Sequence, residues 1–179
     1  MPDLRHTVAA LALVCSVALP EASAAAAPGG DRALQRYAGK WVSEGEFVRT
    51  PYSHNTHVTG TTTCQWSPMR NSLVCDQAVR AGAGEQRDTA LYAYDPSANA
   101  YRYAEFPFDG SPPHITQLTI AGDTWRYFGG FGDAKGGHVV FRTTDVFSGD
   151  DERWRVEFSL DDGKKWIQMG AGSAKHVGN

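Results

Sequence analysis

The chain consists largely of short segments rich in Val, Thr, Tyr, Phe and Trp, separated by Gly, Pro, Asn and Asp. After one short N-terminal helix, no stretch of 11 or more residues repeats apolar residues at helical spacing. Such a pattern is typical of antiparallel strands joined by tight turns, so we expect an all-β fold. About ten strands are expected, at 40–49, 55–66, 72–80, 87–94, 100–107, 114–120, 123–129, 138–147, 151–160 and 164–169.

Several of these segments are apolar on one face only. In 153–160, Trp154, Val156, Phe158 and Leu160 alternate with charged residues. A sheet with one apolar face and no helices to cover it must close on itself or stack on a second sheet. Consecutive hairpins favour an up-and-down antiparallel barrel, which leaves no exposed edge, and a two-sheet sandwich is the alternative.

The N-terminal region has the features of an export signal. The apolar run 8–19 follows a short polar start, and 22–24 read Ala-Ser-Ala, the small residues that signal peptidase requires. Twelve apolar residues are too few to span a ~30 Å hydrocarbon core as a helix. We therefore expect a signal peptide at 1–24, a flexible linker at 25–30, a barrel domain at 31–179, and a secreted or periplasmic protein.

The short helix is expected to begin at Asp31, which can cap it, and to end before Gly39. Removal of the signal peptide leaves two cysteines, Cys64 and Cys75. An even count in an oxidising compartment predicts one disulfide. A turn midway between the cysteines would place them opposite each other across a hairpin, as a structural staple.

One motif links the chain to a known group of barrels. Gly39-Lys40-Trp41 matches the Gly-x-Trp opening of lipocalins and their calycin relatives. With 34–41, 92–96 and 159–166, the chain resembles a family of secreted bacterial domains of unknown function with a lipocalin-like fold. It departs at 70–72, where such relatives have a Gly-Gly pair. The resemblance implies a barrel and supplies no activity.

The segment 159–166 also fits the Ser-x-Asp-x-Gly-x-x-Trp pattern of an Asp-box hairpin. In such a hairpin Asp161 accepts turn amides, Gly163 takes a positive φ, and Trp166 packs beneath the turn. Propeller enzymes carry one copy per blade, whereas this chain has a single copy. We therefore interpret it as a local hairpin lock.

Composition and motifs argue against several functions. The net charge of −3 provides no basic excess for a phosphate backbone, so nucleic acid is not an expected partner. No Gly-x-Ser-x-Gly motif is present, and the acidic pairs Glu44/Glu46 and Glu105/Asp109 are expected to be surface charges. No catalytic residue is therefore predicted.

The histidines do not predict a metal site. His54 and His57 would face opposite sides of a strand, and His114, His138 and His176 lie far apart without a spaced partner. No metal and no cofactor are expected. A haem ligand at His176, by analogy with the nitrobindin barrel, is the remaining alternative, although that family has closely spaced glycines directly after its Trp.

The Gly-rich stretch 129–137 contains a lysine but lacks the Gly-Lys-Ser/Thr ending and the following helix of a phosphate loop. We expect a hairpin loop there, with a lid over the barrel mouth as the functional alternative.

The aromatic content, 11% of residues, is the strongest indication of binding. A barrel of this size either fills with side chains or holds one small ligand. Trp41 and Trp154 are expected to pack in the core. The residues predicted to line a ligand cavity are Trp125, Tyr127, Tyr103, Gln77 and Arg142.

We therefore predict non-covalent binding of a small, partly apolar molecule inside the barrel. The alternatives are an envelope hydrolase or isomerase whose residues converge in the barrel, and a filled scaffold that acts through its surface. The sequence indicates neither the ligand nor the oligomeric state.

Overall fold

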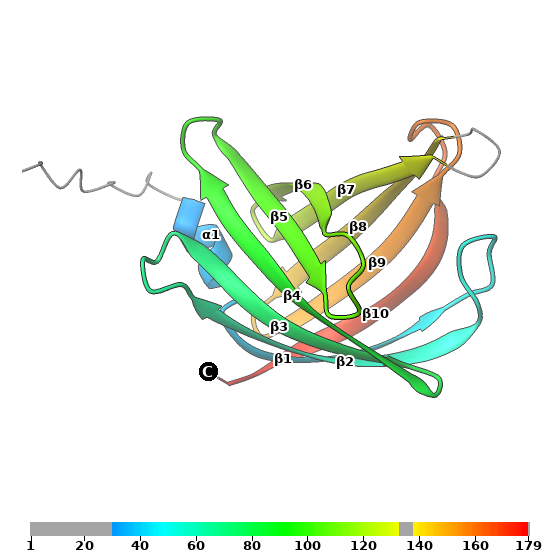
Figure 1. Ribbon diagram of the computed structural model, residues 1–179, viewed down its shortest axis with the longest axis horizontal. Coiled ribbons are helices and arrows are strands. Elements are labelled where there is room, and N and C mark those ends of the chain that lie inside the picture. Colours follow the sequence, from blue (N-terminus) through cyan, green and yellow to red (C-terminus); the bar gives the residue numbers. More distant parts are fainter. Residues whose placement is uncertain (1–29, 133–137, 179) are drawn as a thin grey trace, which may run out of the picture.

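The computed structural model describes residues 30–132 and 138–178, and these form a closed barrel of ten antiparallel strands (Figure 1). Each strand pairs with its neighbours in sequence, and β1 pairs with β10 to close the ring. The predicted up-and-down barrel with one short helix near the N-terminus is confirmed. The elements are α1 (Gly30–Gln35), β1 (Gly39–Phe47), β2 (Thr56–Trp66), β3 (Ser72–Ala81), β4 (Gly84–Asp95), β5 (Ala100–Pro107), β6 (His114–Ala121), β7 (Thr124–Gly132), β8 (His138–Ser148), β9 (Asp151–Ser159) and β10 (Ile167–Gly178).

The two ends of the barrel differ. Helix α1 lies at one end, on the left in Figure 1, where β2 turns into β3 and β4 turns into β5. We call this the helix end. We call the opposite end, where β1 leads to β2 and β3 leads to β4, the mouth. Among the described residues no helix is long and apolar enough to cross a membrane.

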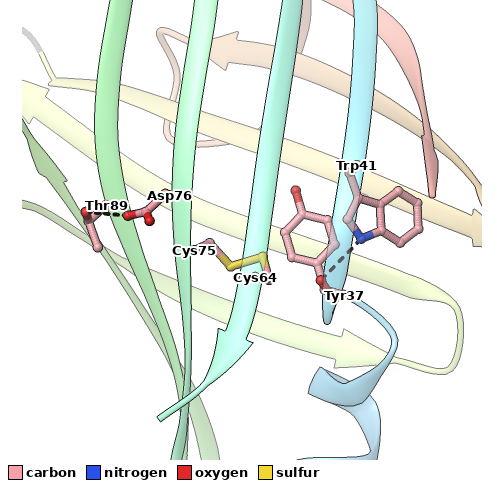
Figure 2. The surroundings of a disulfide bond; sticks show 6 residues. All are labelled: Tyr37, Trp41, Cys64, Cys75, Asp76 and Thr89. Carbon is pink, nitrogen blue, oxygen red and sulfur yellow. Dashed lines mark hydrogen bonds between the residues drawn. A yellow bond between two sulfur atoms is a disulfide. The ribbon is translucent and has the colours of Figure 1, made fainter. Parts of the chain in front are cut away.

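The helix end is filled by large side chains. Leu34 of α1 is buried, and the Tyr37 ring that follows packs against Trp41, Trp125 and Phe147 at centroid distances of 5.5–6.0 Å. The indole Nε1 of Trp41 donates a hydrogen bond to the Tyr37 carbonyl oxygen at 3.2 Å (Figure 2). Trp41 is thus a core residue, as predicted, and this cluster closes one end of the barrel.

The predicted disulfide is present. Cys64 of β2 and Cys75 of β3 are directly opposite in the antiparallel register, with their Cα atoms 4.0 Å apart and a 2.03 Å S–S bond (Figure 2). Both cysteines are buried on the inner face. The bond joins two adjacent strands beside the core cluster at the helix end.

The hairpin between β9 and β10 has the predicted locked geometry. A carboxylate oxygen of Asp161 accepts hydrogen bonds from the Ser159 hydroxyl at 2.7 Å and from the Lys165 amide at 2.8 Å. Gly163 has a φ of +83°, and Trp166 packs against it. Both hydrogen bonds favour the ionised carboxylate and lower the pKa of Asp161.

Strand β10 is longer than predicted, since it continues to Gly178 where the sequence pattern suggested an end at 169. Its middle is rich in small residues because bulky groups pack over it. A methyl group at Gly172 would overlap the Trp154 ring, and one at Gly170 would press on Phe47. The Gly-rich stretch also differs, because 129–132 belong to β7, while 133–137 lie outside the described residues.

Candidate functional site

The barrel encloses a cavity of about 860 Å³ that extends from the Tyr37 cluster to the mouth. Its walls are formed by the inner faces of β1, β3 and β4 through β9. Phe47, Phe131 and Phe141 line it toward the mouth, and Thr143 and Val156 lie farther in. A second buried cluster, formed by Val139, Phe158 and Met169, lies at the mouth end of β8–β10. The cavity is nevertheless large enough for a small molecule.

Four tyrosines form a continuous aromatic wall. The ring centroids of Tyr92 and Tyr103 are 4.9 Å apart, those of Tyr103 and Tyr127 are 5.1 Å apart, and those of Tyr37 and Tyr92 are 5.6 Å apart. Burial raises the pKa of all four phenols, so each hydroxyl stays protonated and can donate a hydrogen bond.

Two carboxyl groups lie beside this wall near the helix end. Asp145 of β8 and Glu152 of β9 line the cavity, with only 6% and 5% of their surfaces exposed. Burial raises the pKa of Asp145 to about 7, although a hydrogen bond from Tyr127 opposes this shift. Burial and the nearby Asp145 charge raise the pKa of Glu152 to about 9. The pair therefore retains protons at neutral pH.

A second cluster of ionisable side chains lies on the inner faces of β4, β5 and β6. The Tyr103 hydroxyl donates a hydrogen bond to Glu105 Oε2 at 3.0 Å, and Glu105 pairs in register with His114. Asp88 lines the same wall, and it is 4% exposed. Burial and then the Glu105 charge raise the pKa of Asp88 to about 6, while His114 opposes them. Sequence analysis expected Glu105 on the outer surface, and the structure corrects this.

The structure brings three of the five predicted cavity residues together. Tyr103, Tyr127 and Gln77 line the cavity. Trp125 is fully buried in the core cluster beneath it, against Tyr37. These placements leave the ligand-binding role of each residue a prediction.

Two expectations need correction. Arg142 lies on the outer face of β8, where it forms an ion pair with Glu157 at 2.7 Å and stacks over the Trp166 ring at 4.2 Å. Its neighbours Phe141 and Thr143 line the cavity instead. Trp154, expected in the core, is half-buried and lines the cavity, because Gly45 and Gly172 leave space for its indole on the barrel wall.

Sequence analysis missed Asp88, Asp145 and Glu152 as cavity residues. Each does continue an apolar alternation within its own strand. Asp145 lies two residues before Phe147, and Glu152 lies two residues before Trp154. A carboxylate on an otherwise apolar strand face was therefore the available signal.

The histidines are spread over the molecule. His57 contacts Glu46 at 2.8 Å and His138 contacts Asp162 at 3.2 Å, both in exposed pairs. His176 packs at 5.1 Å from the Trp41 ring in a separate hollow at the helix end and does not line the main cavity. In the described part of the chain, no three His, Cys, Asp or Glu side chains gather closely enough to hold a metal ion.

The fold of this chain, but not its sequence, matches known proteins. No protein-family model and no curated protein sequence matches this chain. The crystal structure of Rv2717c from M. tuberculosis aligns with a TM-score of 0.57 and 12% identity over 82% of this chain and 96% of that one. The S-type phycobiliprotein lyase CpeS from Guillardia theta aligns with a TM-score of 0.56 and 9% identity over 83% of this chain and 93% of that one. The two alignments show that the chain has a lipocalin-like barrel fold.

Proposed function

We propose that the protein binds a small, partly apolar molecule non-covalently inside the barrel. The observation that carries this proposal is the cavity of about 860 Å³, walled by aromatic rings with a few polar groups among them. Ligand sites in proteins have this size and composition, with apolar walls for affinity and few polar groups for orientation.

The distribution of packing favours binding over a purely structural barrel. Core residues such as Leu34, Trp125 and Phe147 fill the helix end, and a smaller cluster packs on the β8–β10 side of the mouth. Between them the barrel keeps an open volume of about 860 Å³. A scaffold acting through its surface would gain stability from a filled interior, because unfilled space forfeits packing contacts.

Proton-transfer catalysis is a second candidate, favoured by one observation. Asp88, with its pKa raised to about 6, shares the cavity wall with His114 and the hydrogen-bonded pair Tyr103–Glu105. Groups that exchange protons near neutral pH suit an isomerase or hydrolase. In an assay with activated esters and enolisable ketones, turnover that Asp88→Asn abolishes would support this candidate. Retained turnover in that variant would exclude Asp88 as its acid or base.

We also propose that the protein acts outside the cytoplasm, as the predicted leader and the Cys64–Cys75 disulfide suggest. Membership of the secreted bacterial family that the sequence resembles belongs to the same proposal. Mass measurement of the protein isolated from its own cells tests the export step: loss of 1–24 supports it, and a chain that keeps 1–24 contradicts it.

Native mass spectrometry of the protein purified gently from its own envelope tests the binding proposal. We expect a chain that carries a bound small molecule. Thr143→Trp, which places an indole inside the cavity, should weaken binding and reduce that added mass, whereas Thr144→Trp on the outer face should keep it. A bare wild-type chain, or equal retention by both variants, would count against a ligand held in the barrel.

A further inference from the structure

We infer that the cavity selects an organic cation, an ammonium group on an apolar body, seated between the carboxyl groups of Asp145 and Glu152 and the tyrosine wall. This inference rests on the proposed function, because it specifies the chemistry of the molecule that the cavity would hold.

The charges on the cavity wall have one sign. Four acidic side chains line it, and His114 is the single basic side chain among the described residues that do so. No described Lys or Arg points into the cavity. Asp145 and Glu152 hold protons at neutral pH in the ligand-free protein, and a bound cation would favour their ionised forms and release a proton. An anionic guest would find no counter-charge, whereas a cation would gain an attraction that the buried site screens little. The four acidic side chains are Asp88, Glu105, Asp145 and Glu152.

Two of these groups lack hydrogen-bond partners although they are buried. Within the described structure, Glu152 Oε2 and Asp88 Oδ1 contact no donor, and both residues are at least 95% buried. A buried acceptor without a donor destabilises a protein, so native structures rarely leave one. Both residues line the cavity, so a guest beside them can supply the missing donor after a small side-chain rotation. An ammonium group carries up to three N–H donors and the complementary charge.

The tyrosine wall adds a second attraction. Tyr37 is close enough to Asp145 and Glu152 for their charges to raise its pKa, and its ring continues to Tyr92 and Tyr103. The face of an aromatic ring attracts a cation within about 6 Å, and the attraction grows when water is excluded. A guest with an ammonium group near the carboxyl groups would therefore place its apolar body along these rings.

A bare metal ion fits this arrangement less well than an organic cation. In the part of the chain that the structure describes, no group of three His, Cys, Asp or Glu side chains could ligate one. The remaining volume is bounded by side chains such as Phe141, Trp154 and Val156, which need an apolar partner. An ion with its hydration shell would leave that surface wet, whereas an amine with a hydrocarbon or aromatic body would cover it.

Three fluorescent probes with one apolar body test the inference. Dansylcadaverine ends in an ammonium group, 5-(dansylamino)pentanol in a hydroxyl and 6-(dansylamino)hexanoate in a carboxylate. Titration of the recombinant barrel at pH 7.5 should show the ammonium probe binding about 10- to 100-fold more tightly than the alcohol, as for a hydrogen bond to a charged group. The carboxylate probe should bind least tightly.

Substitutions at Asp145 and Glu152 test whether these residues cause the preference for the ammonium probe. Asp145→Asn and Glu152→Gln keep the side-chain shapes, and the double variant should lower the affinity for dansylcadaverine at least tenfold while changing that of the alcohol little. The double variant Glu44→Gln with Glu46→Gln removes two carboxyl groups from the exposed outer face and should leave all three affinities unchanged. Thermal unfolding of each variant verifies that the barrel folds.

The outcomes separate the inference from the proposed function. Equal binding of the three probes, or tightest binding of the carboxylate probe, would overturn the cation preference and leave the ligand-binding proposal intact. Absence of binding by all three would count against both. A preference for the ammonium probe that survives the double variant would overturn the assignment to Asp145 and Glu152.

Discussion

Asp145 and Glu152 are diagonal neighbours on the inner face of the barrel. In the pairing of β8 with β9, Asp145 is opposite Trp154 and Phe147 is opposite Glu152, so the two carboxyl groups lie one diagonal apart on the same face. Neither has a basic partner inside the cavity among the described residues. This pair sets the electrostatics of the cavity.

The stability of the ligand-free protein should fall as pH rises from about 4 to about 9. The folded state holds the protons of Asp145 and Glu152 up to pKa values of about 7 and about 9, whereas the unfolded chain releases them near their ordinary pKa values. Each extra proton in the folded state lowers the free energy of unfolding by up to about 1.4 kcal/mol per pH unit. The other titratable groups facing the cavity are Tyr37, Tyr92, Tyr103, Tyr127, Asp88, Glu105 and His114.

Urea unfolding at a series of pH values measures this slope. The double variant Asp145→Asn with Glu152→Gln should flatten it and be the more stable protein at pH 9. Carboxylates with lowered pKa, such as Asp161, affect stability at acid pH, below this window. A wild-type profile that is flat or rises between pH 5 and 9 would contradict the assigned protonation states.

Gly172→Ala should destabilise the barrel by about 1–3 kcal/mol, because the added methyl group would overlap both the Glu44 carbonyl oxygen of β1 and the Trp154 ring. Gly84→Ala is the matched control, since its methyl group would meet only ordinary contacts. Thermal unfolding and tryptophan fluorescence report both effects. Equal stability of the two variants would contradict the close packing of Gly172 against Glu44 and Trp154.

Arg142→Met should lower stability by roughly 1–2 kcal/mol without changing probe affinity. The substitution removes the ion pair to the nearly buried Glu157 and the stacking over Trp166, both outside the barrel. Chemical denaturation and the dansylcadaverine titration measure the two quantities separately. A tenfold loss of affinity with unchanged stability would place Arg142 in the site after all.

The double variant Cys64→Ala with Cys75→Ala should fold into the same barrel but lose about 2–3 kcal/mol, as expected for a bond that closes a loop of 11 residues. Alanine is preferred to serine because both positions are buried on the inner face. Denaturation of the wild-type protein with and without reductant provides the comparison. A loss much below 1 kcal/mol would show that β2 and β3 hold their register without the staple.

The fold could be predicted from the sequence because the contacts that determine it are local. The turn between Cys64 and Cys75 specifies their register, and the Asp161–Gly163–Trp166 pattern specifies its own hairpin through contacts within a few residues. The full length of β10 could not be predicted from the sequence, because its glycines weaken the strand pattern. Glycines are needed there because the bulky rings of Phe47 and Trp154 on neighbouring strands leave no space for side chains.

Only part of the candidate site could be predicted from the sequence, for a related reason. Tyr103, Tyr127 and Gln77 could be placed inside by alternation along their own strands. The acidic lining could not be recognised in the same way, since a single Asp or Glu on a strand is most often a surface charge. Only closure of the barrel shows that β4, β8 and β9 direct theirs toward one space.

A crystal structure of the protein with dansylcadaverine tests the central claim most directly. We predict electron density for the dansyl rings inside the barrel, with the ammonium nitrogen about 2.7–3.2 Å from a carboxylate oxygen of Asp145 or Glu152. A probe bound on the outer surface, or one inside the barrel with its ammonium group directed out of the mouth, would contradict it.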